Sequence, residues 1–176
     1  MKSLKLPLAV LGLCLTLVLA CTGASGEGET DLDGREPPQF ERPPATTASS
    51  GGATAEMGIG TFCWTNACVD YIGPITKGSL RVTNGAEVTV AVPAGLMLTE
   101  VHASLWPATG AQTINTGDTA WVPSQFPDDL PDLPATISGN EVRVRVSAPT
   151  GQHVLVVGMW FASGGDVQYS VVIDLQ

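Results

Sequence analysis

The chain is poor in the side chains on which most hydrolytic enzymes depend. Its 176 residues include two histidines, His102 and His153, and contain no G-x-S-x-G, no H-E-x-x-H and no phosphate-binding glycine loop. A hydrolytic triad needs a histidine to activate its nucleophile. These absences argue against an enzyme and favour a binding or structural module that needs no cofactor.

Basic residues are also scarce. Eight Lys and Arg stand against 17 Asp and Glu, which gives a net charge of −9 at pH 7. The basic residues form no cluster, and a nucleic-acid-binding surface needs one. We therefore expect no nucleic-acid partner. An anionic lipid surface would repel this chain, so charge does not hold it at a membrane.

The apolar run near the start is too short for a membrane-spanning helix. Residues 6–20 are almost entirely apolar and follow Lys2 and Lys5. A spanning helix needs about twenty apolar residues, whereas a basic start before a shorter apolar stretch is typical of a secretory signal. The sequence predicts a signal peptide over residues 1–20.

The end of this segment, Val18-Leu19-Ala20-Cys21, resembles the lipobox of bacterial lipoproteins. In that family the cysteine thiol receives a diacylglyceryl group, the signal peptide is removed before the cysteine, and the new amino terminus is usually acylated. The resemblance implies lipidation of Cys21. Acyl chains contribute about 0.8 kcal/mol per buried CH₂. We therefore expect an extracytoplasmic protein that this lipid anchors to a membrane of the cell envelope.

A stretch with little to bury follows the cysteine. Residues 22–56 contain Leu32 and Phe40 as their large apolar side chains, among acidic residues, glycine, serine and proline. Such a composition cannot offset the entropy that is lost on ordering. We predict a lipidated cysteine and a disordered tether over residues 21–56, followed by one domain over residues 57–176.

From residue 57 onward, apolar residues recur at every second position, which buries one face of a strand and leaves the other in water. Residues 153–161 are apolar on both faces, which is typical of a central strand. The clearest alternating sets are Val88, Val90 and Val92; Val142, Val144 and Val146; and Val167, Tyr169, Val171, Ile173 and Leu175.

Turn residues separate these runs. Asn84-Gly85 predicts a hairpin between residues 81–83 and 86–88, and Ser163-Gly164-Gly165 joins the last two strands. No helical period of useful length is present. Roughly seven to nine strands in a segment of this length are typical of a β-sandwich. We predict an all-β fold with a single β-sandwich, and a small barrel is the alternative.

One segment, residues 106–140, is too long for a routine connection between strands. Such loops are either functional or loosely ordered. A short strand is expected within it at residues 119–122. The segment is interrupted by Pro107, Pro123, Pro127, Pro131 and Pro134.

Two cysteines, Cys63 and Cys68, remain in the domain and predict one disulfide in an oxidising compartment. With Thr65-Asn66 at the centre of a tight turn, Cys63 faces Cys68 in a non-hydrogen-bonded pair, where side chains come closest. The alternative is a redox or metal site. We favour the disulfide because the domain has no second cysteine pair.

The residues around these cysteines, Phe62-Cys63-Trp64 and Cys68-Val69-Asp70, resemble a "YCW…CVD" hairpin of uncharacterised extracytoplasmic bacterial proteins. Residues 165–170 are also similar to those proteins. The resemblance implies an extracytoplasmic location and a disulfide, and no activity. The last hairpin is similar to the last two strands of immunoglobulin-like domains, with His153 in place of their corner tyrosine, so we expect an immunoglobulin-like sandwich.

Three groups of residues are candidates for a site. His102 and Glu100 share a strand face with Ser104 and Trp106 if the residues between them face the core, although a partly exposed strand face explains this cluster more simply. Trp106 and Trp121 flank the long loop and are candidates for ligand stacking, although a core or loop-anchoring role explains each of them more simply. We expect Trp160 to be in the core. Asp128, Asp129 and Asp132, together with Asp118, are candidate Ca²⁺ ligands, although a solvated acidic loop explains them more simply.

These features favour a binding or structural module of the envelope whose ligand is a protein or a glycan. The alternative is an envelope hydrolase or metal-dependent enzyme. It would use the long loop as a lid, with Glu100, His102 and the acidic loop residues as its site.

Overall fold

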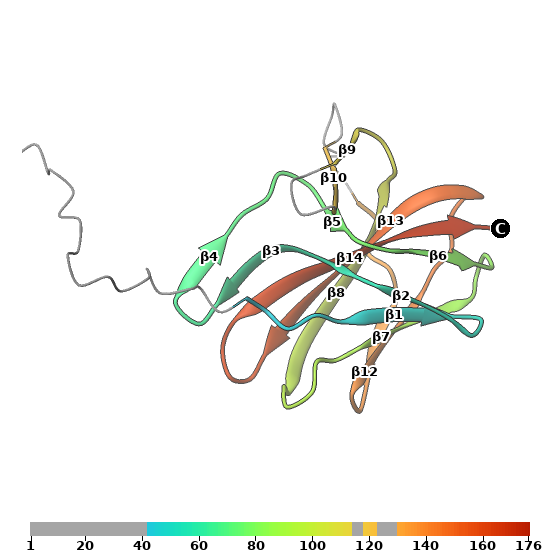
Figure 1. Ribbon diagram of the computed structural model, residues 1–176. Coiled ribbons are helices and arrows are strands. Elements are labelled where there is room, and N and C mark those ends of the chain that lie inside the picture. Colours follow the sequence, from blue (N-terminus) through green and yellow to red (C-terminus); the bar gives the residue numbers. More distant parts are fainter. Residues whose placement is uncertain (1–41, 114–117, 123–129) are drawn as a thin grey trace, which may run out of the picture. The chain divides into compact units, whose positions relative to one another are not determined.

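β-strands make up the regular structure in the part of the chain that the computed structural model describes, residues 42–113, 118–122 and 130–176 (Figure 1). Within these ranges there is no helix of the length and apolar character that crossing a bilayer requires. The strands are β1 (Thr47–Ser50), β2 (Ala53–Glu56), β3 (Gly58–Trp64), β4 (Ala67–Val69), β5 (Ile75–Thr76), β6 (Ser79–Val82), β7 (Glu87–Ala91), β8 (Leu98–Pro107), β9 (Ala111–Thr113), β10 (Thr119–Trp121), β11 (Ala135–Ser138), β12 (Glu141–Arg145), β13 (Gly151–Phe161) and β14 (Asp166–Leu175).

Two of the sheets enclose the core. A five-stranded sheet has the order β11-β12-β7-β1-β2. The other, which we call the main sheet, has the order β4-β3-β14-β13-β8, and β6 pairs with β14 in parallel. Buried side chains from both sheets form one apolar cluster. The predicted all-β sandwich is therefore confirmed.

The alternating valines lie where the pattern placed them. Val88 and Val90 of β7 and Val142 and Val144 of β12 have no exposed surface, while Glu87 at the start of β7 points to solvent. Alternate residues of β14, from Val167 to Leu175, lie in the same core. We call this face of the main sheet its inner face and the opposite one its outer face.

Strand β13 is central, as its apolar character predicts, because it pairs with β8 on one side and β14 on the other. On the inner face, Leu155 and Val157 lie in the main core. On the outer face, Val154 and Val156 are also buried, in a second cluster with Val172. The outer face is therefore covered at this point.

A small third sheet, β5-β10-β9, provides this cover. Its strands lie together at the top of Figure 1. Trp121 of β10 packs in the second cluster and is 8% exposed, and its indole Nε1 donates a hydrogen bond of 2.8 Å to Thr76 Oγ1 of β5. A polar indole group with a partner can be buried at little cost.

The glycine at position 58 lets β5 approach the main sheet. A Cβ at this position would lie 2.1 Å from the carbonyl oxygen of Ile75, so a larger residue does not fit. The hydroxyl of Ser170, which is opposite Gly58 on β14, donates a hydrogen bond to the same carbonyl. These contacts fix where the cover crosses the outer face.

The prediction of a disordered tether up to residue 56 is wrong for its last part. Residues 47–56 form the β1–β2 hairpin, which turns at Gly51 and Gly52 with φ values of +57° and +83°. β1 pairs with β7, and Ala48 has no exposed surface. Backbone pairing and one small buried residue stabilise a strand that has no large apolar side chain. Residues 21–41 of the predicted tether lie outside the described residues.

The segment before β1 is also attached to the core. The hydroxyl of Tyr169, a fully buried residue, donates a hydrogen bond of 2.7 Å to the carbonyl oxygen of Pro44. Burial raises the pKa of Tyr169 well above its ordinary value, because the phenolate would lose its hydration. Tyr169 is therefore a neutral donor that holds the start of the domain against the sandwich.

Two further predictions need correction. The turn at Asn84 and Gly85 is present, with a hydrogen bond from Ala86 N to Thr83 O, but it forms no hairpin. It carries the chain from β6 in the main sheet to β7 in the five-stranded sheet. The predicted loop 106–140 is not one loop, because it contains β9, β10 and β11. The short strand expected at residues 119–122 is confirmed as β10.

Candidate functional site

The outer face of the main sheet has a covered half and an open half. The covered half lies under the β5-β10-β9 sheet. The open half lies towards the other end of β8, β13 and β14. Strand pairing forms two rows of neighbouring residues there. One row is His102, Gly158 and Gln168, and the next is Glu100, Trp160 and Asp166.

Trp160 is an exposed aromatic residue of the open half. Its side chain is 38% exposed. A Cβ at position 158 would lie 3.0 Å from Cζ3 and 3.1 Å from Cη2 of this indole. The ring therefore folds back along β13 over Gly158, which has no side chain to displace it.

His102 holds the indole from the neighbouring strand. The two ring centroids are 5.4 Å apart and the ring planes are 81° apart, which is an edge-to-face contact. His102 Nε2 lies 2.8 Å from Glu100 Oε1. The predicted pair of Glu100 and His102 is therefore on one exposed strand face, and it positions an aromatic ring.

We call the surface formed by Trp160, Gly158 and His102 the platform. A groove of about 560 Å³ adjoins it. Gln168 connects the groove with the platform, because it lines the groove and lies directly beside Gly158 across the β13–β14 pair. The groove is lined by Thr61, Asp70, Tyr71, Ile72, Gly73, Trp106 and Gln168.

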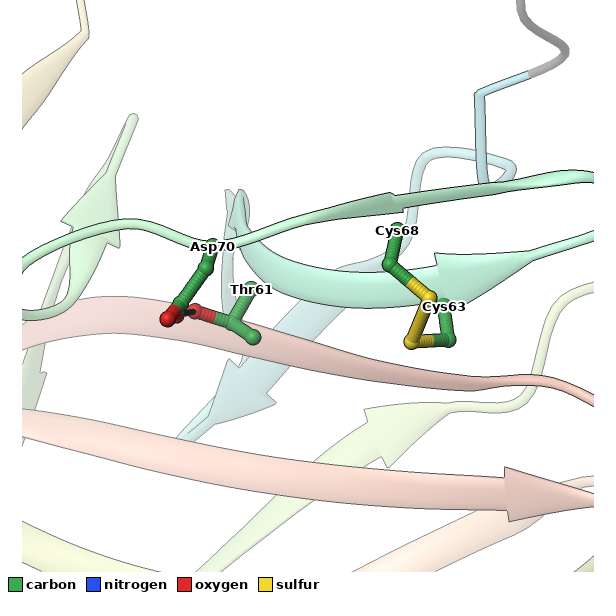
Figure 2. Close-up of a disulfide and its surroundings, with 4 residues drawn as sticks. All are labelled: Thr61, Cys63, Cys68 and Asp70. Carbon is green, nitrogen blue, oxygen red and sulfur yellow. Dashed lines mark hydrogen bonds between the residues drawn. A yellow bond between two sulfur atoms is a disulfide. The ribbon is translucent and has the colours of Figure 1, made fainter. Parts of the chain in front are cut away.

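The cysteine hairpin forms one wall of the groove. Cys63 and Cys68 form the predicted disulfide, with Cα atoms 4.0 Å apart, and Trp64 pairs with Ala67 beside the turn. Further along β3, Thr61 Oγ1 donates a hydrogen bond of 2.9 Å to Oδ1 of Asp70, which follows β4 (Figure 2).

The same hydroxyl fixes the residue that follows Asp70. Thr61 Oγ1 accepts a hydrogen bond of 3.1 Å from the backbone N–H of Tyr71. Tyr71 is 37% exposed and lines the groove. The disulfide-linked hairpin thus presents a second exposed aromatic ring to the open half.

The structure separates the tryptophans. Trp121, a candidate for ligand contact for which a core or loop-anchoring role is the simpler expectation, is buried and bonded to Thr76 and so has the core role. Trp160 was predicted to lie in the core, but it is exposed. Trp106 is half-buried, packs against the second cluster and lines the groove, so its place is compatible with ligand contact.

The error at Trp160 has a physical reason. Alternation correctly puts Trp160 on the same face as Val154 and Val156, and those two valines are buried. The covering sheet ends before it reaches Trp160. Gly158, two residues earlier on the same face, was the available signal, because a glycine in a strand marks a close approach by another group.

Two of the four acidic residues proposed for Ca²⁺, Asp118 and Asp132, lie in the described part of the chain, and they are on separate segments. Asp128 and Asp129 lie outside the described residues. The backbone of Asp132 forms an isolated β-bridge with Ser104 of β8. Asp118 precedes β10 and lies near Lys77. Throughout the described part of the chain, no group of three or more His, Cys, Asp or Glu side chains is arranged to hold a metal ion.

Comparison of the chain with family models, with curated proteins and with solved structures gives no match. The candidate site is therefore defined by its own geometry: an indole on a glycine, a histidine–glutamate pair that supports it, and an adjoining groove walled by a disulfide-linked hairpin.

Proposed function

We propose that this chain is a lipid-anchored, extracytoplasmic binding module of the cell envelope, and that its ligand lies on the open half of the outer face. The anchor rests on the signal-like segment and the lipobox resemblance at Cys21. The disulfide is typical of proteins that fold in an oxidising compartment.

The observation that carries the binding role is the exposed indole of Trp160 in a fixed position. Single exposed apolar side chains are common on protein surfaces, so exposure alone does not carry the proposal. Trp160 differs because Gly158 beneath it and His102 beside it hold its ring in one place. A ring that is already positioned loses little conformational entropy when a ligand binds.

Hydroxyl-radical footprinting tests this proposal without knowledge of the ligand. We expect oxidation of Trp160 to be several-fold slower in intact envelopes than in the purified full chain, because the ligand covers the indole. Ile137 of β11 in the five-stranded sheet is 42% exposed and serves as the control. Its relative oxidation should not change.

Two results would contradict the proposal. The first is equal oxidation of Trp160 in envelopes and in the purified chain. The second is equal protection of Trp160 and Ile137, which would indicate general shielding by the envelope and no particular binding face.

A further inference from the structure

We propose that the ligand of the open half is an extended chain of uncharged sugar rings. This inference rests on the proposed binding function and names the chemistry of its ligand. It is based on the aromatic rings of the face, on the polar groups between them, and on the charge of the surface.

The aromatic rings lie at two connected places. Trp160 lies on Gly158, and Gln168, directly beside Gly158, leads into the groove that Tyr71 and Trp106 line. The C–H faces of pyranose rings are apolar and pack on the negative faces of aromatic rings. Two adjoining places favour a ligand with several rings over a single sugar.

The polar groups between these rings suit hydroxyl groups. Gln168 has an amide that both donates and accepts hydrogen bonds, and it lies between the platform and the groove. Sugar hydroxyls also donate and accept. A side chain with both capacities therefore matches a sugar better than it matches a purely apolar ligand.

The charge of the face excludes anionic polymers. Glu100 and Asp166 lie in the open half, and Asp70 lines the adjoining groove. In the two rows of the open half that the structure describes, the basic side chain is His102, and it is bonded to Glu100. Like charges across an interface are unfavourable. An acidic glycan or a nucleic acid would be repelled here.

Two of these carboxylates also have partners within the protein, since Asp70 accepts a hydrogen bond from Thr61 and Glu100 is paired with His102. The choice of a saccharide rests on the other groups of the face. The aromatic rings of Trp160 and Tyr71 and the neutral amide of Gln168 are suited to uncharged sugars.

The test is a titration of the purified full chain, followed by tryptophan fluorescence and calorimetry. The probes are cellohexaose and hexa-N-acetylchitohexaose, which are uncharged chains of glucose and of N-acetylglucosamine, and a galacturonate hexamer, which is anionic. We expect at least one uncharged hexamer to bind, its monosaccharide to bind at least about tenfold more weakly, and the galacturonate hexamer not to bind.

Two variants identify the site. Trp160→Ala should weaken binding by about tenfold through loss of the stacking surface. Gly158→Ala should also weaken it, because the new Cβ displaces the indole, while Trp160 itself remains. Ile137→Ala on the five-stranded sheet should leave the affinity unchanged. All three variants should unfold within a few degrees of the midpoint of the unmodified chain.

The inference is overturned if neither uncharged hexamer binds, if the galacturonate hexamer binds as well as they do, or if Trp160→Ala and Gly158→Ala both keep full affinity. Footprinting separates this failure from that of the binding function. Protection of Trp160 in envelopes with no binding of uncharged hexamers contradicts the sugar ligand alone, whereas loss of both results contradicts both proposals.

Discussion

Replacement of Cys21 by serine should abolish incorporation of labelled fatty acid into the protein. A serine hydroxyl cannot form the thioether that links the diacylglyceryl group to a lipoprotein cysteine, so the lipid chains that we propose as the anchor are lost. Each chain would otherwise contribute about 0.8 kcal/mol per buried CH₂. The measurement is labelling with a radioactive or clickable palmitate in cells, followed by intact mass spectrometry of the purified protein.

Cys14→Ser is the matched control, because Cys14 lies inside the predicted signal peptide. It should leave labelling intact, and the mature protein should begin at position 21. Labelling that persists in Cys21→Ser, or a native protein that begins at Met1 with an unmodified thiol at position 21, would remove the basis for the proposed anchor.

Replacement of Gly58 by alanine should destabilise the domain strongly. The new Cβ would lie 2.1 Å from the carbonyl oxygen and 2.6 Å from the carbonyl carbon of Ile75, and both are backbone atoms that cannot rotate away. Overpacking of this kind costs about 3 kcal/mol of unfolding free energy. The measurement is the free energy of unfolding from denaturant titration.

Gly60 provides the control on the same strand. A Cβ at this position would lie 3.4 Å from its nearest neighbour, the carbonyl oxygen of Gln168, which is close to ordinary contact. Gly60→Ala should change the unfolding free energy by no more than about 0.5 kcal/mol. If the two variants prove equally stable, β5 does not approach the main sheet as described.

The core of the fold could be predicted from the sequence because its period is simple. Strands with Val88, Val90 and Val92 or with Val167, Tyr169 and Val171 alternate strictly, and alternation is what a half-buried strand requires. The disulfide could also be predicted, since Thr65-Asn66 as a turn places Cys63 opposite Cys68.

Other parts of the fold depend on partners that are distant in the sequence. The β1–β2 hairpin contains small and polar residues, and its stability comes from pairing with β7 and from the buried Ala48. The turn at Asn84 and Gly85 satisfies a hairpin pattern locally. Each flanking strand, however, finds a better partner in a different sheet, β14 for one and β12 for the other.

The candidate site was predictable on β8 and not on β13. Alternation correctly put Glu100 and His102 on an exposed face. Whether Trp121 or Trp160 is exposed depends on where three short strands cross the outer face. The close contact of Gly58 with the backbone of Ile75 and the hydrogen bond from Trp121 to Thr76 fix the positions of these strands. Both contacts are between segments that are far apart in the chain.

The central claim is that a small sheet covers one half of the main sheet's outer face and leaves the half that carries Trp160 open. Hydrogen exchange of the indole N–H groups, measured by NMR on the purified chain, tests it most directly. We predict slow exchange at Trp121, whose Nε1–H is buried and bonded to Thr76, and fast exchange at Trp160. Equal rates at the two indoles, or slower exchange at Trp160, would contradict the claim.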